Sequence, residues 1–232
     1  MLLKTNFHFH TNEDPAHRID YGITEGIDRA SELGFKVLAL TCHGKVVFKK
    51  EHGDYALSKD ILLISGIEIE ISEDGSNGRH LLILNCGKEA EGIKTFKDLE
   101  EYRKNSPEMF VIAPHPFFPS LSGKQSLLEY TERYLHLFDA LEHSWFYSKM
   151  LNKNVQAQKL SKERSVPLVA TSDTHFFNFL DTDYCLIEAK EMSTEAIFSA
   201  IKEGSFENVT RAKKLISEML IPYGRFYLKN SY

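Results

Sequence analysis

The sequence predicts an α/β fold built around a largely parallel sheet. Short apolar runs alternate with segments of helical period, which is the pattern of such folds. The runs are rich in Val, Ile, Leu and Phe without strict polar alternation, as expected for strands covered on both faces. Histidines and a few carboxylates follow these runs closely, and α/β folds place function at the carboxyl ends of parallel strands.

About seven apolar runs are strand candidates. They span residues 3–9, 37–41, 61–71, 80–84, 109–113, 140–142 and 168–171, with 184–188 as an eighth candidate. Residues 73–78 read Glu-Asp-Gly-Ser-Asn-Gly, which is a turn composition. The two runs on either side of this turn are therefore expected to form a hairpin within the otherwise parallel pattern.

Helices are expected between the strands. Their ranges are 24–33, 96–104, 127–138, 149–163 and 194–203. The first starts with Thr-Glu and stops at Gly34, and the last has Ser193 or Thr194 as its N-cap and Gly204 as its stop. Residues 212–220 are expected to form a final helix, and no pattern assigns residues 223–232.

Composition favours one domain over residues 1–232, because 232 residues that are 42% hydrophobic suffice for one substantial core. The net charge is −5, and the densest basic cluster is Lys49-Lys50 with Lys45 nearby. This argues against binding of duplex nucleic acid, but it does not exclude a narrow substrate groove.

The cysteines and the hydropathy pattern predict a cytoplasmic protein. The three cysteines form no CxxC pair, so a disulfide scaffold is not expected and a reducing compartment is favoured. No apolar run approaches the roughly 18 residues needed to span a bilayer, and a polar residue already stands at position 4. Neither membrane insertion nor secretion is therefore expected.

His8 and His10 are two apart on a predicted strand, so their imidazoles share one face and can converge on one ion. Four further residues stand where an apolar run has just ended. They are His43, His115, Asp173 and His175. Each has an ordinary alternative as a loop or turn residue, but their coincidence favours a metal site.

Glu68 lies inside an apolar run, where a carboxylate is costly unless it is paired or binds a metal. We expect it to bridge two ions, although Glu70 shares its face in a regular strand and could take that role. His80 starts the next strand, and a hairpin would return it towards Glu68, which favours a ligand role.

Six short motifs carry a family resemblance. They are His8-Phe9-His10-Thr11, Leu40-Thr41-Cys42-His43, Gly66-Ile67-Glu68-Ile69, His80-Leu81-Leu82, Ala113-Pro114-His115-Pro116 and Thr171-Ser172-Asp173-Thr174-His175. In this order they resemble the PHP (polymerase and histidinol phosphatase) superfamily over roughly residues 2–186. The resemblance implies a distorted (β/α)7 barrel that holds two or three divalent ions, and many members hydrolyse phosphoesters.

The resemblance also implies a ligand set. One ion would be held by His8, His10, Glu68 and Asp173, a second by Glu68, His80 and His115, and a third by His17, His43 and His175. Asp14 is the alternative to His17, because the chain departs here from the serine-rich turn with an aspartate found in many members. Mixed imidazole and carboxylate ligation suits zinc, manganese or iron without choosing among them.

We expect a metal-dependent phosphoesterase that hydrolyses a small phosphorylated metabolite or nucleotide through a hydroxide bridging two ions. Asp173 and Glu68 are the expected catalytic residues, and His143 is a candidate general acid, added ligand or plain cleft residue. Arg18 and Arg79 are candidates for phosphate contacts, because guanidinium binds oxyanions bidentately, or they are only surface charges.

Three other functions stay open. A PHP-type nuclease on single-stranded ends would need a basic, aromatic approach, for which only Lys45, Lys49 and Lys50 near His43 are candidates. An amidohydrolase-like C–N hydrolase would share the His-x-His start and a late aspartate, and a non-catalytic module would require a broken ligand set. The substrate, the choice between monoester and diester, and the oligomeric state stay undetermined.

The sequence also indicates segments that border the pocket. Residues 14–21, 45–57 and 117–126 are expected to border the pocket. The aromatic residues around Phe118 and Trp145-Phe146 are expected in the core or at the rim, with pocket lining as the alternative.

Overall fold

A computed structural model describes residues 1–75, 78–118, 127 and 129–230 of the chain. Its strands form one sheet in the order β7-β6-β5-β4-β3-β2-β1-β8-β9. Their bounds are β1 Leu2–Phe9, β2 Val37–Leu40, β3 Leu62–Ile71, β4 Arg79–Leu84, β5 Phe110–Ala113, β6 Ala140–His143, β7 Leu168–Ala170, β8 Asp183–Glu188 and β9 Phe206–Thr210. The eight predicted strands are all present within one or two residues at each end.

Most of the sheet is parallel, as the sequence predicts. β1, β2 and β3 pair in parallel, and so do β5, β6 and β7. β4 runs antiparallel to both β3 and β5, which confirms the inserted hairpin. The predicted turn at 73–78 includes residues 76–77, which lie outside the described residues. β8 and β9 continue the sheet beyond β1 in antiparallel fashion, and β9 was not predicted.

The sheet curls into a nearly closed barrel. At one end, Thr174 after β7 pairs with β1, because its N–H donates to the His8 carbonyl at 3.1 Å and its carbonyl accepts from the His10 N–H at 3.3 Å. Along β7 itself, the side-chain amide of Asn208 in β9 forms hydrogen bonds with the backbone. Its Oδ1 accepts from the Ala170 N–H at 2.7 Å and its Nδ2 donates to the Leu168 carbonyl at 2.6 Å. This side-chain amide thus takes the place of backbone hydrogen bonds between β7 and β9.

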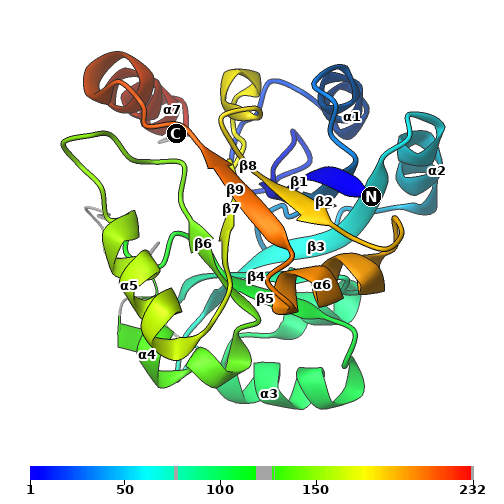
Figure 1. Cartoon of the computed structure of the whole chain (residues 1–232), viewed down its shortest axis with the longest axis vertical. Coiled ribbons are helices and arrows are strands. Elements are labelled where there is room, and N and C mark those ends of the chain that lie inside the picture. The colour runs from blue at the N-terminus through cyan, green and yellow to red at the C-terminus, as the bar shows by residue number, and fades with distance from the viewer. Residues whose placement is uncertain (76–77, 119–126, 128, 231–232) are drawn as a thin grey trace.

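Most of the helices lie around the outside of the sheet (Figure 1). Their bounds are α1 Ile23–Glu32, α2 Lys50–Ser58, α3 Phe96–Asn105, α4 Glu129–Arg133, α5 Asn154–Arg164, α6 Thr194–Lys202 and α7 Ile221–Asn230. α6 packs Ile197 and Phe198 against barrel residues such as Phe7 and Phe110, and the rings of Phe110 and Phe198 stack with centroids 4.5 Å apart. These apolar residues fill one end of the barrel, and the polar residues lie at the opposite end.

Some helices differ from the prediction for local reasons. The helix expected over 149–163 begins only at Asn154, because the Ser148 hydroxyl accepts from the N–H groups of Met150 and Leu151 and holds a turn instead. The helix expected over 127–138 is the short α4 followed by a 3-10 turn, Leu135–Leu137, and residue 128 lies outside the described residues. α2 was not predicted.

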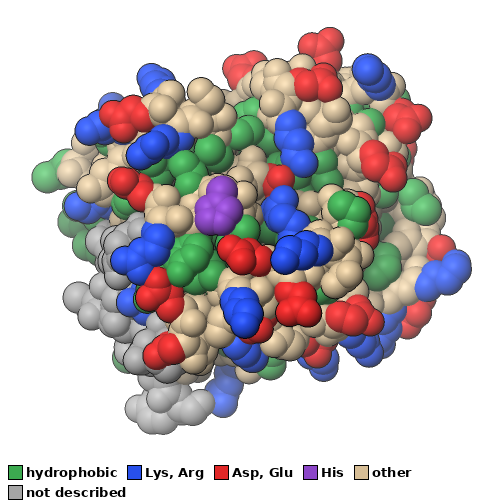
Figure 2. All heavy atoms as spheres, turned by 90° about the horizontal axis from the view of Figure 1, so that it is seen from below, with side chains coloured by type: hydrophobic (Ala, Val, Ile, Leu, Met, Phe, Trp, Pro, Cys, Tyr) green, Lys and Arg blue, Asp and Glu red, His purple; other side chains and the backbone are tan. Residues whose placement is uncertain are grey.

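The C-terminal region is helical further than predicted. A π-helical segment, Leu215–Leu220, continues directly into α7, which includes most of the residues that had no assigned pattern. Among the helices of the described residues, none combines the length and the apolar composition that a bilayer crossing requires. On the face seen from below, Lys and Arg side chains are interspersed with Asp and Glu (Figure 2).

Replacement of Asn208 by Ala is expected to lower the free energy of unfolding by about 1–2 kcal/mol, because two partly buried backbone groups of β7 lose their partner. Urea denaturation measures the change. Glu207→Ala, at an exposed neighbour on the same strand, is the control. Equal stabilities of the two variants would contradict a closing role for the amide.

Candidate metal centre

The polar end of the barrel gathers the nine side chains that the sequence predicted as ligands. They are His8, His10, His17, His43, Glu68, His80, His115, Asp173 and His175, each in contact with another member of the set. They come from β1 and the loop that follows it, from the interior of β3, from the start of β4, and from the segments that follow β2, β5 and β7. The register of β1 against β2 shifts next to His8, and such irregularities re-aim side chains near active sites.

Glu68 lies at the middle of this cluster and is only 2% exposed. Its Oε2 is 3.0 Å from His8 Nε2, 3.2 Å from His10 Nε2 and 3.0 Å from His43 Nε2. Glu70, the alternative from the sequence, is exposed.

The other oxygen of Glu68 faces a different pair of imidazoles. Oε1 lies 2.7 Å from His80 Nδ1 and 3.4 Å from His115 Nε2. His80 reaches this place because the hairpin of β3 and β4 pairs it with Glu70 across the sheet. Glu68 therefore separates two groups of imidazoles, one on each carboxylate oxygen.

Asp173 adds the second carboxylate on the same side as His8 and His10. Its Oδ1 is 3.4 Å from His8 Nε2, 3.3 Å from His10 Nε2 and 3.2 Å from His175 Nδ1. The outer imidazole, His17, has its Nδ1 3.0 Å from His175 Nε2. Asp173 and His115 both have positive φ, 43° and 30°, a backbone conformation that persists where surrounding structure enforces it and that is common at functional sites.

Asp14 holds the cluster from behind. Its Oδ2 lies 2.8 Å from the Nδ1 atoms of both His10 and His43 and accepts the His43 backbone N–H at 2.9 Å. Its Oδ1 accepts the N–H groups of Ala16 and His17. Both oxygens are thus occupied, and a carboxylate on Nδ1 fixes the ring so that Nε2 faces Glu68.

Glu142 does the same for His8 and was not singled out from the sequence. It is fully buried, and its Oε1 is 3.1 Å from His8 Nδ1 and accepts from the Thr171 hydroxyl. Its Oε2 accepts the His115 backbone N–H. The apolar strand pattern before Glu142 was the available signal, since a buried carboxylate needs a partner.

His143 follows Glu142 on β6 and faces the other way, because successive strand residues point to opposite faces. Its Nδ1 is 3.4 Å from Asn154 Nδ2 on α5, and its ring meets the Tyr147 ring edge-on with centroids 5.0 Å apart. Burial, aided by the charge of Lys213, lowers the pKa of His143 to about 4. The structure does not bring this predicted catalytic residue into the cluster.

The cluster stabilises positive charge. Burial alone lowers the pKa of His8, but Asp173, Glu68 and Glu142 outweigh it and raise that pKa to about 10. Burial would raise the pKa of the Glu68 carboxyl, but the surrounding histidines hold it well below its usual range. A buried place of this kind favours cations.

Several buried atoms of the cluster need a ligand. Within the described chain, His10 Nε2, Glu68 Oε1, His80 Nδ1 and Asp173 Oδ1 lie 2.7–3.4 Å from one another or from other cluster atoms without hydrogen-bond geometry, and His115 Nδ1 has no hydrogen-bond partner. Unsatisfied buried polar atoms are rare, and coordination to a metal satisfies them. The residues therefore fit divalent ions bound by imidazole and carboxylate, a donor set that suits transition metals.

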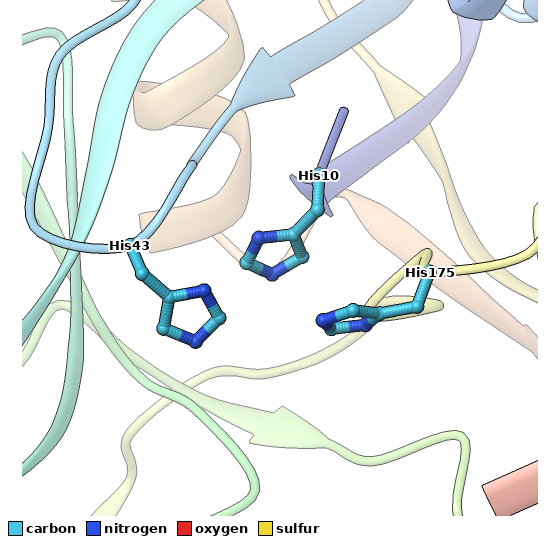
Figure 3. A group of neighbouring side chains, drawn as sticks. All are labelled: His10, His43 and His175. Carbon is cyan, nitrogen blue, oxygen red and sulfur yellow. The ribbon is translucent and has the colours of Figure 1, made fainter. Parts of the chain in front are cut away.

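Four groups of residues place one ligand atom each within 4.8 Å of one another. The groups are His10, His43 and His175; His8, His10 and Glu68; Asp14, His17 and His43; and His43, Glu68 and His80. Figure 3 shows the first of them, with three rings that come from separate strand ends and turn towards a common space. Asp14 and His17 belong to one group, so both sequence alternatives lie at the cluster.

A cavity lies over the cluster and encloses about 570 Å³, counting the part that opens to solvent. Its floor consists of His17, His43, Glu68, His80, His115, Asp173 and His175. Its walls are six aromatic residues, Phe118, Trp145, Phe146, Phe176, Tyr223 and Phe226.

The walls come partly from the segments that the sequence indicated. Phe118 belongs to the predicted border 117–126, of which residues 119–126 lie outside the described residues, and His17 belongs to 14–21. Residues 45–57 do not line this cavity. Tyr223 and Phe226 were missed, because the tail carried no pattern.

The two arginines predicted to contact phosphate lie elsewhere. Arg18 is exposed and lines a separate groove with Asn230, whose Oδ1 accepts the Arg18 backbone N–H at 2.6 Å. Arg79 precedes His80 on β4, so its side chain faces away from the cluster. Neither lines the cavity.

No protein-family model and no curated protein matches the sequence. Solved structures do match. A two-domain protein from Bacteroides vulgatus that contains a predicted PHP-like metal-dependent phosphoesterase has 21% identity and a TM-score of 0.68, covering 91% of this chain and 65% of its own. The lesion-specific endonuclease PfuEndoQ from Pyrococcus furiosus has 15% identity and a TM-score of 0.58, covering 90% and 58%.

An amidohydrolase from Chromobacterium violaceum also matches, with 13% identity, a TM-score of 0.56, and coverage of 88% of this chain and 97% of its own. The chain spans less than two thirds of the length of the first two structures. These similarities confirm the predicted fold, a distorted PHP-like barrel.

Asp14→Asn and Glu142→Gln are each expected to weaken metal binding about 10- to 100-fold, because each removes the carboxylate that orients a histidine. Competition with a chelator followed by metal analysis measures the affinity. Glu70→Gln, an exposed carboxylate of β3, is the matched control. Unchanged affinity in both variants would show that these carboxylates do not support ligands.

Proposed function

We propose that the protein is a metal-dependent phosphoesterase that hydrolyses a small phosphorylated substrate. One observation carries the proposal. The buried carboxylate of Glu68 has imidazoles on both oxygens, with His8, His10 and His43 on Oε2 and His80 and His115 on Oε1. A carboxylate placed in this way can bridge two neighbouring ions, which is the arrangement used for phosphate ester hydrolysis.

The protein's own residues would hold and orient such ions. Glu68 and Asp173 would supply negative charge, and the cluster's histidines would supply neutral donors in the sets predicted from the sequence. Zinc, manganese or iron, as two or three ions, would provide an activated water and polarise the phosphoryl oxygens. Asp14 and Glu142 would keep the imidazoles of His10, His43 and His8 in one orientation.

The same geometry guides the assignment of the other predicted residues. We propose Glu68 and Asp173 as the catalytic carboxylates, and Asp14 as a positioning residue rather than a ligand, because both of its oxygens are already bonded. His143, Arg18 and Arg79 have no place in this proposal, since none of them lines the cavity.

The context of the enzyme is part of the proposal. We place it in one metallohydrolase domain, residues 1–232, in a reducing, cytoplasmic setting. All three cysteines, Cys42, Cys86 and Cys185, are buried and free, which suits a reducing compartment.

A nuclease is the second candidate, because the fold is shared with an endonuclease. A nucleic-acid strand needs cations along its track as well as stacking residues. Among the described residues that line the cavity there is no Lys or Arg, and this favours a small phosphorylated substrate.

Asp173→Asn and Glu68→Gln are expected to lose bound metal and to reduce kcat/KM about a thousandfold or more, because metal ions contribute several kcal/mol of transition-state stabilisation. Metal analysis and assays with phosphomonoesters, phosphodiesters, short single-stranded oligonucleotides and N-acyl amides measure both effects. Glu70→Gln is again the control.

The panel also decides among the alternatives. Cleavage confined to oligonucleotides would favour the nuclease, and cleavage of amides alone would favour the amidohydrolase. Turnover and metal content unaffected by both substitutions would refute the proposal.

A further inference from the structure

The cavity changes character with distance from the metal cluster. Its floor is imidazole and carboxylate, and the described residues of its walls are aromatic. A phosphate group over the floor would therefore leave the rest of its ester among aromatic rings. Fold and ligands fix the reacting centre, whereas the walls select the substrate.

Three of the wall rings form one surface. The Phe118 and Phe146 rings meet at 4.9 Å between centroids, Phe146 and Tyr223 at 5.3 Å, and Phe118 and Tyr223 at 6.2 Å. Phe118 also meets the ring of His115 at 5.9 Å. This surface thus begins directly beside a metal-centre histidine.

A second pair of rings faces the other histidines. The Phe226 ring meets His17 at 4.9 Å and His175 at 4.8 Å, both edge-on, and meets Phe176 at 5.6 Å. A ring held here lies next to the place where the phosphate would bind. Aromatic pairs in such edge-on and offset arrangements are favourable beyond the area that they bury.

The C-terminal helix presents both Tyr223 and Phe226, which are three residues apart and therefore share one face of α7. α7 is tied down beside His17. The Asn230 side chain accepts the Arg18 N–H, and Lys229 forms an ion pair with Asp20. The aromatic wall is thus fixed to the same loop that carries His17.

The walls provide little for a second anionic group. None of the described lining residues is Lys or Arg, and both lining carboxylates are engaged by histidines. A charge moved from water to this aromatic surface would lose hydration without gaining a counter-charge.

We propose that the ligand is a phosphate ester whose alcohol part carries a flat aromatic ring and no second anionic group, with Phe226 and Tyr223 as the specificity-determining residues. This rests on the proposed function for the position of the phosphate. The ring would stack against the walls while the phosphate lies over the cluster.

The test compares ligands that differ either in ring character or in a second anionic group. Binding of benzylphosphonate, cyclohexylmethylphosphonate and para-carboxybenzylphosphonate to metal-loaded protein is measured by calorimetry. Hydrolysis of benzyl phosphate, cyclohexylmethyl phosphate and ethyl phosphate is measured separately. Phe226→Leu and Tyr223→Leu remove a ring, and Leu228→Ala, at a 68% exposed position of the same helix, is the control.

We expect para-carboxybenzylphosphonate to bind more weakly than benzylphosphonate, because its carboxylate would lose hydration without gaining a counter-charge. Benzylphosphonate should bind about three- to tenfold more tightly than cyclohexylmethylphosphonate, which is the size of effect that aromatic pairs contribute beyond buried area. Phe226→Leu or Tyr223→Leu should reduce this preference to less than about twofold, and Leu228→Ala should keep it. Equal binding of the benzyl and cyclohexylmethyl compounds to the unsubstituted protein overturns the inference, whatever the variants do.

The two proposals fail in different ways. Hydrolysis of all three esters at equal kcat/KM, with equal phosphonate binding, would leave the phosphoesterase intact and remove the ring specificity. A clear preference for benzylphosphonate without hydrolysis of any ester would uphold the ring site and overturn the phosphoesterase.

Discussion

The burial of the Glu68 carboxylate is the constraint around which the polar end of the barrel is organised. A carboxylate on a strand inside the barrel is stable only when positive charge or hydrogen-bond donors surround it. Five imidazoles surround the Glu68 carboxylate here. They come from four other strands or from the loops that follow those strands. The same requirement makes the place suitable for cations, since ions satisfy the carboxylate and the imidazoles together.

That arrangement needs a support layer. Asp14 holds His10 and His43, and Glu142 holds His8 while also accepting the backbone N–H of His115. The rings of His8, His10 and His43 are therefore fixed through Nδ1 and offer Nε2 to Glu68. Buried polar networks of this type are stable when every member is satisfied.

The barrel depends on its closure to bring these residues together. β7 and β1 meet through Thr174, and β9 reaches β7 through the amide of Asn208. Opening that seam would separate Asp173 and His175 from His8 and His10. The C-terminal helix then completes the cavity, because it carries Phe226 to His17 and Tyr223 to Phe118.

Most of the fold and the candidate ligands followed from local patterns. The strands are continuous apolar runs, and His8 and Asp173 stand at or near strand ends, whereas Glu68 stood out as a carboxylate inside such a run. The resemblance to the PHP superfamily added the closed barrel and the grouping of ligands. Such predictions need only the residues of each strand and its neighbours in the sequence, and not the packing of the strands.

The remaining features arise from contacts between residues far apart in the chain. The orientation of His143 away from the cluster follows from the position of Glu142 on the barrel interior, and the roles of Asp14 and Asn208 follow from their partners. The aromatic walls combine Phe118, Trp145 and Phe226, which no sequence period connects. Sequence patterns specify which residues can be buried or bind metal, but burial partners are set by how the strands and helices pack in three dimensions.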